Sequence, residues 1–449
     1  MSAPLPSQDP ASPSASEAAD GETAVETMVR VQQEVEQALE GGSEDDVQAL
    51  IEPLHSADIA DLLEQLTEDN RQSLIAILRP QLSQDPEFLS HLAEDVREDL
   101  LEGLHPHEVA GALAELESDD ALELIEDLDP GERVKILESL PASDRRILEE
   151  GLTFPEDSAG RLMQREVVAV PMFWTVGKTI DYLRATDDLP SDFFLIFATD
   201  PGHHPVGAAP LSRILRSKRS VKIGELLDNE IRQIPVDMDQ EEVAYLFHQY
   251  GLVSAPVVDG DGRLVGVITV DDVVHVIHEE AEEDFLALGG VQEDDLYRDI
   301  LETSRSRFSW LGINLITAIL ASAVIALFEG TIERLVALAI LMPIVASMGG
   351  NAGTQALTVA VRAIALRNVT DKTALRLLSK EVAVGTINGL LFAVVAGLAA
   401  GFWFSDPMLG GVIGVAMVVN LVVGGFAGAL IPLTLERFGV DPAIASGVI

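Results

Sequence analysis

The sequence predicts a multidomain protein in which an α-helical repeat domain, an α/β region and a long connecting helix precede an α-helical polytopic membrane domain. The distribution of charge is the first observation behind this prediction. The chain has 449 residues with 29 basic and 74 acidic side chains, a formal net charge of -45. Residues 309–449 contain 7 basic and 7 acidic residues, which leaves 22 and 67 in residues 1–308. The chain therefore has a strongly acidic part and a neutral part.

The neutral part contains four uncharged apolar runs, and these are the second observation. A helix needs about 20 residues to cross the hydrocarbon core of a bilayer. The four runs are Trp310–Phe328, Leu335–Val361, Val382–Phe404 and Leu409–Leu435. Residues 309–449 are therefore expected to form a transmembrane domain with four spans in contact with lipid.

Basic residues in the short loops predict the orientation of these spans. The loop between the second and third runs is basic, and the other two loops contain only Arg334. The basic residues of that loop are Arg362, Arg367, Lys372, Arg376 and Lys380. Because basic loops stay on the cytosolic side, we expect a multi-pass protein of the inner (plasma) membrane with residues 1–308 in the cytosol.

Composition excludes several classes of function. The acidic excess argues against a nucleic-acid partner, because a phosphate backbone requires a basic face. The chain has no cysteine, so it has neither disulfides nor thiolate metal sites. No histidine lies near a serine or an acid within the spans, so we expect no enzyme active site there. Residues 1–26 lack the basic-then-apolar pattern of a secretory signal and predict a disordered acidic tail.

Residues 27–153 predict the helical repeat domain. A short phrase of leucine followed by a turn residue begins at Leu54, Leu78, Leu104 and Leu128, which are 24, 26 and 24 residues apart. Leucine and isoleucine residues at helical spacing follow these phrases. Turn-helix units at a nearly fixed period are typical of a helical solenoid. An ordinary helical bundle is the alternative.

Residues 154–280 predict the α/β region, and residues 281–308 the connecting helix. Short β-branched or apolar runs alternate here with helical stretches. The expected strands are Val167–Val170, Phe193–Phe197, Ile234–Val236, Ala255–Val258 and Leu264–Val270, and the expected helices are Val176–Arg184 and Glu241–Tyr250.

An acidic run without Lys or Arg extends from Leu264 to Tyr297 and contains ten acids. Like charges three or four residues apart on a helix repel each other. The acids that fall close to one side are Asp272, Glu279, Glu280, Glu283 and Asp284. A divalent cation would offset the repulsion, since hard oxygen ligands suit Mg²⁺ or Ca²⁺. A solvated acidic face is the alternative.

The second span contains polar and flexible residues where lipid-facing helices are apolar. Pro343 is followed by Gly349, Gly350, Asn351 and Gln355. Asn351 and Gln355 are four residues apart and share one side of a helix. Neutral oxygens at membrane depth can contact a hydrated cation. We therefore expect the two glycines and the two amides to line an ion path.

The fourth span has a small or polar residue at every fourth position. These residues are Asn420, Gly424, Gly428 and Pro432, a spacing typical of close helix packing. Packing suffices to explain the glycines. Asn420 needs a polar partner or a wet cavity inside a span, so it joins the expected ion path.

The order of these regions and several phrases strongly resemble the MgtE family of magnesium channels. The segment from Ser254-Ala-Pro-Val-Val-Asp to Gly266-Val-Ile-Thr-Val-Asp-Asp272 is similar to the second module of a CBS-domain pair, and residues 161–217 fit a degenerate first module. The other phrases are Phe154-Pro-Glu-Asp-Ser-Ala-Gly-Arg-Leu-Met163, Gly350-Asn-Ala-Gly-Thr-Gln355 and Gly439-Val-Asp-Pro-Ala443. The resemblance covers nearly the whole chain beyond about residue 27.

The resemblance implies a homodimeric, Mg²⁺-selective channel or transporter for magnesium uptake, with tandem CBS domains in residues 154–280. It also implies that cytosolic Mg²⁺ closes the pore by binding acidic sites between the helical domain, the CBS pair and the connecting (plug) helix. The matching sensor ligands are Asp239, Asp272, Glu280, Glu283 and Asp284.

A nucleotide is a further implication of the CBS resemblance. Gly266, Thr269 and Asp272 match a phrase that holds an adenosine ribose in CBS modules, which predicts ATP at the second module. A structural Thr/Asp helix cap is the alternative.

The sequence also departs from the family pattern. His275, Gly251, His107 and Gly111 stand where acids are usual, which predicts weaker or altered Mg²⁺ sensing. The family has a fifth span with an ion-holding carboxylate, whereas this chain ends at Ile449, eight residues after Asp441. We therefore expect the chain to be incomplete at that end.

Two other functions remain open on the sequence. A membrane-anchored cytosolic sensor of nucleotides or divalent ions would carry no ion flux. A transporter of another divalent cation, Mn²⁺ or Co²⁺, is disfavoured by the lack of cysteine and of histidine in the spans.

Overall fold

In the computed structural model the chain forms two compact units, Met1–Val273 and Val274–Ile449, which are described separately. The structure describes residues 24–82, 86–93, 96–97, 100–101, 103–126, 128–186, 189–190, 193–228, 230–291, 300–365, 370–438, 440 and 442. The expected tail up to residue 23, residues 292–299 of the expected connecting helix, and Asp441 lie outside these ranges.

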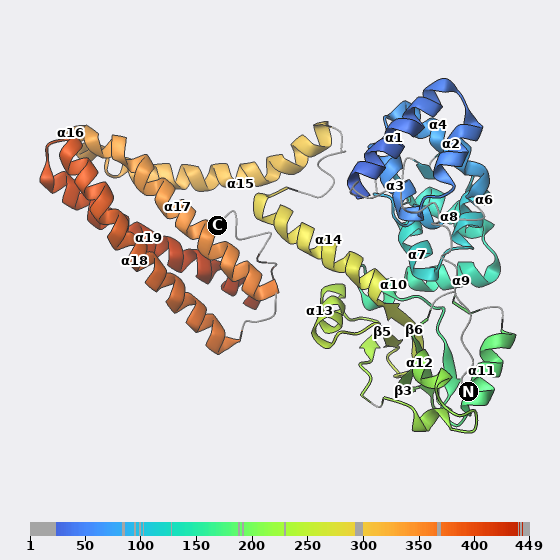
Figure 1. Ribbon diagram of the computed structural model, residues 1–449. Coiled ribbons are helices and arrows are strands. Elements are labelled where there is room, and N and C mark those ends of the chain that lie inside the picture. Colours follow the sequence, from blue (N-terminus) through green and yellow to red (C-terminus); the bar gives the residue numbers. More distant parts are fainter. Residues whose placement is uncertain are drawn as a thin grey trace, which may run out of the picture. The chain divides into compact units, whose positions relative to one another are not determined.

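The first half of unit one is helical (Figure 1). Its helices pack around one core, in which Leu62, Leu63, Leu74, Leu124 and Ile125 are fully buried. The helices are α1 (Ala24–Gly41), α2 (Glu44–Ile51), α3 (Ser56–Gln65), α4 (Glu68–Leu78), α6 (Pro106–Leu113), α7 (Ser118–Glu126), α8 (Pro130–Ser139) and α9 (Ala142–Gly151). Two short 3-10 helices, η1 (Arg79–Gln81) and η2 (Glu87–Leu89), follow α4.

The repeated leucine phrases mark helix starts. His55 is the N-cap of α3, and its own backbone N–H donates to the Asp58 carboxylate at 3.4 Å. His105 is the N-cap of α6, and its backbone N–H donates to the Glu108 carboxylate at 2.9 Å. These contacts satisfy backbone groups that a helix start leaves unpaired. The phrase at Leu78 leads only into η1, so the repeat is less regular than the sequence spacing predicts.

The described residues in the second half of unit one form two three-stranded sheets of the same topology. In each, the first strand pairs parallel with the middle strand and the third pairs antiparallel with it. The strands are β1 (Ala169–Pro171), β2 (Leu195–Thr199), β3 (Pro205–Pro210), β4 (Ile234–Pro235), β5 (Ser254–Val258) and β6 (Leu264–Thr269). The accompanying helices are α10 (Ala159–Leu162), α11 (Val176–Ala185), α12 (Leu211–Leu215), η3 (Ile223–Glu225) and α13 (Gln240–Tyr250).

The sequence did not predict β3. Prolines bound this strand and Gly207 lies inside it, a composition that disfavours strands. Antiparallel pairing with β2 nevertheless holds it in place, with Ala208 opposite Phe197. A β-carbon at Gly207 would come within 2.9 Å of the Leu227 side chain, so the glycine allows the close approach.

Helix α14 (Val270–Gly289) follows β6 directly in sequence and runs into unit two. Gly290 follows it with a φ of 66°, the left-handed conformation that commonly ends helices. The next described helix, α15, begins at Ile300. The helix expected at residues 281–308 is therefore interrupted at its glycine pair.

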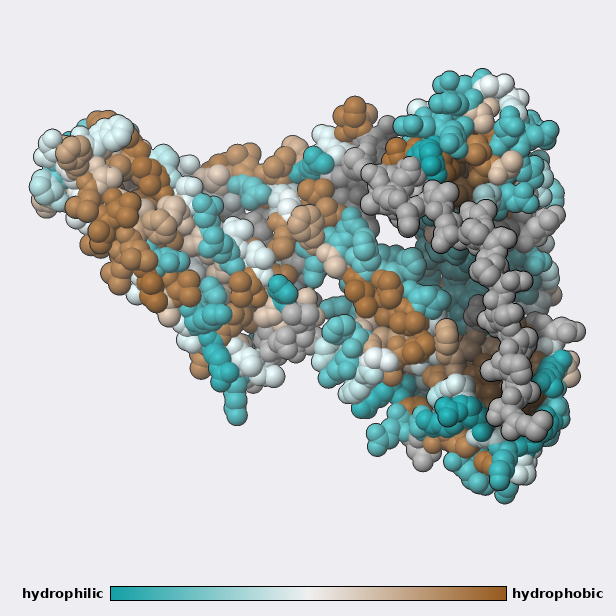
Figure 2. Space-filling view, in the orientation of Figure 1, coloured by the Kyte–Doolittle hydropathy of each residue, from teal (hydrophilic) through white to brown (hydrophobic). Residues whose placement is uncertain are grey.

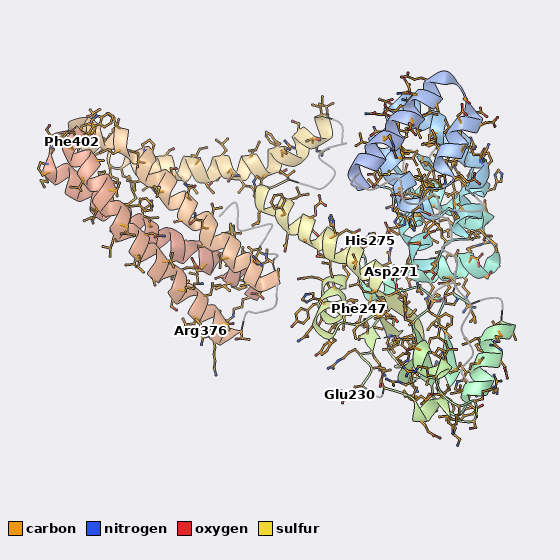
Figure 3. The ribbon with its side chains drawn as sticks, in the orientation of Figure 1. Glu230, Phe247, Asp271, His275, Arg376 and Phe402 are labelled. Carbon is orange, nitrogen blue, oxygen red and sulfur yellow. The ribbon has the colours of Figure 1, made fainter. Side chains whose placement is uncertain are left out.

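Among its described residues, unit two contains four helices long and apolar enough to cross a membrane, one at each of the four predicted spans. They are α15 (Ile300–Ala326), α17 (Val336–Ala365), α18 (Asp371–Trp403) and α19 (Pro407–Arg437), with the short α16 (Glu329–Arg334) before α17. Both α17 and α18 pack along α19. Hydrophobic residues cover much of the visible face of these helices (Figure 2). Arg376 and Phe402 mark opposite ends of α18 (Figure 3), so the Arg376 end is the cytosolic one on the loop-charge argument.

Candidate ion sensor and ion path

An acidic junction lies where the helical domain meets the end of the second three-stranded sheet within unit one. We define it as Glu117, Asp119 and Asp120 at the start of α7, with Asp271 and Asp272 in the first turn of α14. Apolar residues of α7 are buried in the helical core and fix the position of that helix. Figure 3 shows Asp271 at the beginning of α14.

Hydrogen bonds from uncharged donors fix the α7 side of this junction. The Ser118 hydroxyl donates to the Glu166 carboxylate at 2.8 Å and accepts from the Arg165 backbone N–H at 2.7 Å. The Gln164 amide donates to the Glu117 carboxylate at 2.7 Å. These bonds attach the start of α7 to the segment that follows α10.

Burial and like charge raise the pKa of the carboxyls at the junction. Burial raises the pKa of Glu117 to about 7, with further contributions from Glu166, Asp272 and Asp271. Burial also raises the pKa of Asp120 to about 7, helped by Asp272. Charged forms of these groups are therefore disfavoured at neutral pH.

Asp119 is the most enclosed member of the junction. Its side chain is buried, at 8% exposure, and burial followed by the charges of Asp272 and Asp120 raises its pKa well above the usual range. One carboxylate oxygen accepts from the Asp120 backbone N–H at 3.0 Å. The other, Oδ2, has no hydrogen-bond partner among the described residues. A buried oxygen of this kind is stabilised by a proton or a cation.

The carboxylates do not enclose an ion in the present arrangement. Within the described ranges, no three His, Asp or Glu side chains converge closely enough to hold a metal. The donor chemistry nevertheless fits Mg²⁺, which takes oxygen ligands and commonly keeps several waters. A hydrated ion among these acids would not require three of them at direct bonding distance.

The sequence-predicted sensor residues fall in three places. Asp272 belongs to the junction. Asp239 is the N-cap of α13, where its carboxylate accepts from the Glu241 backbone N–H at 3.0 Å. It lies beside Asp157, whose pKa is raised by burial first and then by Asp239. The remaining three, Glu280, Glu283 and Asp284, share one side of α14 in unit two.

Sequence reasoning missed Glu117, Asp119, Asp120 and Asp157. The only sequence signal for the first three is the phrase Glu117-Ser-Asp-Asp120 at the start of an apolar helix. Acids at a helix start are common, because they interact favourably with the helix dipole, so the phrase did not indicate a site. Their closeness to Asp272 is a tertiary contact that no local pattern contains.

One of the positions that depart from the family pattern, Gly251, has a structural explanation. Gly251 ends α13 with a φ of 61°, a left-handed conformation that favours glycine. In the phrase that contains His107 and Gly111, the acid Glu108 pairs with Arg79 at 2.6 Å. The Arg79 hydrogen bond is the main reason that the Glu108 pKa falls to about 2. His275 lies exposed one helical turn after Asp271 (Figure 3).

The predicted nucleotide residues form a helix start. The Thr269 hydroxyl donates to the Asp272 carboxylate at 2.6 Å, and the Thr269 backbone N–H donates to it at 3.3 Å. Gly266 faces the Met163 side chain and the Gln164 carbonyl, with no room for a β-carbon. This geometry matches the helix-cap alternative.

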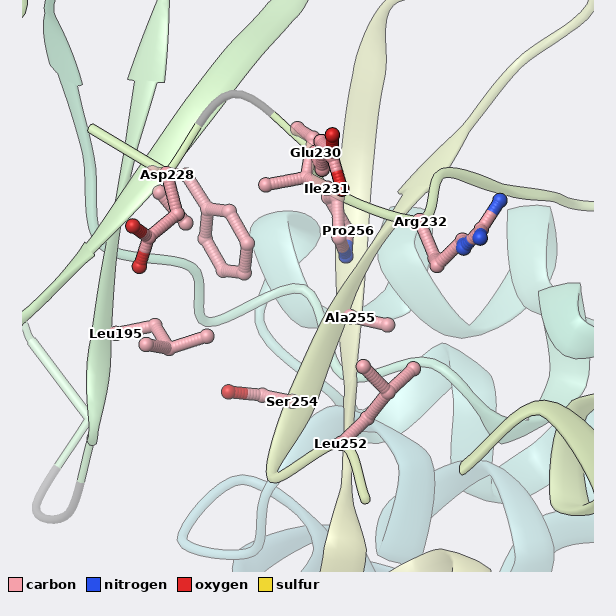
Figure 4. Close-up of a pocket in the computed structure, with 11 residues that line it drawn as sticks. Leu195, Asp228, Glu230, Ile231, Arg232, Leu252, Ser254, Ala255 and Pro256 are labelled. Atoms are coloured by element: carbon pink, nitrogen blue, oxygen red, sulfur yellow. The ribbon is translucent and has the colours of Figure 1, made fainter. Parts of the chain in front are cut away.

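A pocket opens between the two three-stranded sheets (Figure 4). Its empty volume is about 440 Å³, including space open to solvent. Apolar side chains and the Ser254 hydroxyl line it together with Asp228, Glu230 and Arg232. Gly266, Thr269 and Asp272 are not among its lining residues.

The residues of the predicted ion path lie on two sides of α17. Gly349 is buried against α19, and the Asn420 side-chain amide donates to the Val345 carbonyl at 2.5 Å. Asn351 and Gln355 are exposed on α17. Gly350 is also exposed, and a β-carbon there would meet open space.

Comparisons with known proteins follow this division of the chain. The MgtE intracellular N domain matches residues 54–157, the CBS domain matches residues 223–279, and the MgtE divalent cation transporter domain matches residues 342–449. The magnesium transporter MgtE of Thermus thermophilus is 32% identical over 415 residues, 91% of this chain and 92% of that protein. This chain belongs to the MgtE family.

Other MgtE proteins are similarly related. The magnesium transporter MgtE of Bacillus subtilis is 27% identical over 410 residues, 91% of this chain and 90% of its own length. The cytosolic domain of an Mg²⁺ channel MgtE, crystallised in complex with ATP, is 29% identical and has a TM-score of 0.51, covering 55% of this chain and 99% of that one. Magnesium transport, the CBS domain and a multi-pass inner-membrane location are therefore established for this MgtE family member.

The acidic junction joins two separately matched parts of an MgtE chain. Glu117, Asp119 and Asp120 lie within the match to the N domain, and Asp271 and Asp272 lie within the match to the CBS domain. A change in contact between these two domains therefore changes the surroundings of the buried acids.

Proposed function

We propose that this protein takes up Mg²⁺ along the face of α17 that bears Asn351 and Gln355, and that cytosolic Mg²⁺ reduces the flux by binding the acidic junction. The buried, unpaired Oδ2 of Asp119 is the observation that carries the regulatory part. Nearby carboxyls with pKa values raised to about 7 add negative charge that a divalent cation would neutralise.

Bound Mg²⁺ would couple the helical domain to α14. The ion would hold the start of α7 against Asp271 and Asp272, which belong to the first turn of α14. Helix α14 continues from there towards the membrane spans in sequence. Loss of the ion would leave like charges at the junction, which favours separation of α7 from α14.

The other predicted sensor residues would provide additional positions for Mg²⁺. Asp239 with Asp157 forms one acidic pair in unit one. Glu280, Glu283 and Asp284 form a second group, at helical spacing on α14. We assign the strongest regulatory effect to the junction, because only there is a carboxylate buried among the described acids of these groups.

An Asp119→Asn variant tests the regulatory proposal. Protease digestion of the purified protein is followed while Mg²⁺ is titrated, and Mg²⁺ flux is measured in vesicles. We expect the variant to need about tenfold more Mg²⁺ for protection, the size expected when one carboxylate leaves a charged site. Glu149→Gln on the exposed end of α9 is the control. Protection of the wild type that is unchanged by millimolar Mg²⁺ would reject the proposal.

The same vesicles test the ion path and its selectivity. Asn351→Ala and Gln355→Ala should each reduce Mg²⁺ flux, while Leu390→Ala on the exposed surface of α18 should not. Parallel assays with Mn²⁺ and Co²⁺ measure selectivity. Flux of either ion faster than that of Mg²⁺ would contradict a path built from neutral oxygens for a hydrated ion.

We further propose that ATP binds the pocket between the CBS modules. The support is the pocket itself, with apolar walls and the Ser254 hydroxyl, and the ATP complex of a related cytosolic domain. Ser254→Tyr should block ATP binding in a calorimetric titration, whereas Thr269→Val should leave it nearly unchanged. The reverse result would assign the nucleotide to the Gly266, Thr269 and Asp272 site that the sequence predicts.

A homodimer is the assembly that we propose for the membrane part. Asn351 and Gln355 are exposed within one chain, and amides at membrane depth need polar partners or water. A second copy facing them would enclose a wet path. Cross-linking in membranes checks this: a single-chain band at every cross-linker concentration would contradict it.

A further inference from the structure

Asn420 lies inside the fourth span at the contact between α19 and α17. Its amide Nδ2 donates to the Val345 carbonyl at 2.5 Å. Val345 follows Pro343, which cannot donate a backbone hydrogen bond and so interrupts the ladder of α17. The bond therefore joins α19 to α17 just beyond the point where the hydrogen bonding of α17 is weakened.

Gly349 makes this contact possible. A β-carbon at position 349 would overlap the Asn420 amide, so a larger residue requires α17 and α19 to separate or the amide to turn away. The glycine contacts continue along both helices. A β-carbon at Gly424 would come within 2.7 Å of the Gly349 carbonyl, and one at Gly428 would overlap the Gly353 carbonyl. The backbone of α17 from Val345 to Gly353 is thus held directly by α19.

The polar amides of α17 face away from this contact. At about 100° per residue, Asn351 lies about 200° around the helix from Gly349, and Gln355 lies about 240° from it. Both are exposed, in agreement with that rotation. Asn420 therefore contacts the side of α17 opposite to Asn351 and Gln355.

We propose that Asn420 is a positioning residue: its amide fixes the rotation and depth of α17 on α19, and so determines where Asn351 and Gln355 point, without touching Mg²⁺. The proposal rests on the ion path proposed above. It differs from the expectation drawn from the sequence, in which Asn420 itself lines that path.

Four variants test this in vesicles that contain the purified protein, with Mg²⁺ flux measured over a range of Mg²⁺ concentrations. Asn420→Ala removes the donor, and Asn420→Asp keeps an oxygen but replaces the donor with a carboxylate. Gly349→Ala introduces the overlap, and the double variant Gly349→Ala/Asn420→Ala removes it again. Gly411→Ala on α19 is the matched control, because a β-carbon there has no atom within 4 Å.

A positioning role predicts a shared pattern. Asn420→Ala and Asn420→Asp should lower the maximal flux roughly three- to tenfold, the range set by loss of one interhelical hydrogen bond. The half-saturating Mg²⁺ concentration should stay within about twofold of the wild type, because no ion ligand is lost. The double variant should conduct faster than Gly349→Ala alone, since the added methyl occupies space that the amide has left.

A ligand role predicts the opposite pattern. Asn420→Asp would then keep or strengthen Mg²⁺ binding, because a carboxylate is a better ligand than an amide. A shift of the half-saturating concentration in Asn420→Ala with an unchanged maximal flux would overturn the proposal. So would a double variant that conducts no faster than Gly349→Ala. Size-exclusion profiles identify variants that do not assemble, and if Asn420→Ala is among them, Asn420→Ser replaces it in every comparison.

The proposed ion path is tested separately from the role of Asn420. If Asn351→Ala and Gln355→Ala conduct as the wild type does, the path is elsewhere. The contact of Asn420 with Gly349 is still decided by whether the double variant conducts faster than Gly349→Ala.

Discussion

The acidic junction and the α17–α19 contact both hold helices together, but by opposite means. At the junction, acids with raised pKa values surround Asp119, and one of its oxygens has no partner among the described residues. At the helix contact, glycines bring uncharged backbones together, and a neutral amide donates the side-chain hydrogen bond from Asn420 to Val345.

This difference indicates which of the two contacts can respond to pH and to divalent cations. Buried like charges depend on pH and on divalent cations, so the strength of the junction changes with conditions. Backbone packing between glycines depends on shape and is nearly independent of both. The proposed sensor uses the first kind of contact, and the proposed ion path is held by the second.

The largest expected effect is a bulky residue in the α17–α19 contact. In Gly428→Val, the side chain would overlap the Gly353 carbonyl and press on the Ala356 methyl. We expect a loss of about 3 kcal/mol or more from overpacking, seen as aggregation in detergent and absence of Mg²⁺ flux. Gly411→Val, where the new side chain meets open space, should behave like the wild type. Equal profiles for the two variants would mean that the glycine contact does not hold the helices.

Neutralising the buried acid should have the next largest effect, and in the opposite direction. In Asp119→Asn without Mg²⁺, we expect the apparent melting temperature of the soluble part to rise by about 2 to 6 °C, because an amide can be buried without the proton uptake that the Asp119 carboxyl requires on folding. The rise produced by Mg²⁺ should shrink at the same time. Glu149→Gln controls for loss of an exposed charge. A lower melting temperature for Asp119→Asn would show that the carboxylate is stabilised by a partner.

The pH dependence of the junction follows from the raised pKa values. Glu117 and Asp120 have pKa values of about 7 in the folded protein, against ordinary values of 4.5 and 3.8. Their protonated forms stabilise the folded state at low pH, and this stabilisation is lost as pH rises through about 7.

Without Mg²⁺ we therefore expect protease resistance at the junction to fall from about pH 5 to about pH 7, between the ordinary and the raised pKa values, and to level off towards pH 8. Saturating Mg²⁺ should reduce the fall, because the ion replaces the protons. Asp120→Asn should show a shallower pH profile than the wild type, and Glu149→Gln should not. Resistance that increases towards pH 8 would have the wrong sign for carboxyls with raised pKa values.

Sequence patterns predicted the two regions unequally. The four spans are long, uncharged runs, so composition alone locates them, and α17 and α19 begin and end within a few residues of the predicted bounds. The glycine spacing in the fourth span also predicted close packing correctly. The partner of Asn420 could not be predicted, because it is a backbone carbonyl 75 residues away.

The junction shows a deeper limit of sequence patterns. The acidic run on α14 is recognisable in the sequence because its charges are closely spaced. Asp119, the most buried acid among the described residues, follows an ordinary Glu-Ser pair instead. Its burial arises from the packing of α7 against the segment around Gln164. Strand β3 was missed for a related reason, since its pairing with β2 and not its composition makes it a strand.

The smallest expected effect tests whether the location of an acid, and not only its charge, decides its part in Mg²⁺ sensing. Glu108 is an acid of the same kind as Glu117, but it is partly exposed and has Arg79 as its partner at 2.6 Å, which lowers its pKa to about 2. Solvent and salt screen such a pair. Arg79→Gln should therefore change the apparent melting temperature by less than about 1 °C at 0.3 M salt. Mg²⁺-dependent protection should stay as in the wild type, because α6 lies outside the junction. A clear loss of protection would mean that exposed pairs of the helical domain also contribute to Mg²⁺ sensing, and the contrast drawn between buried and exposed acids would no longer hold.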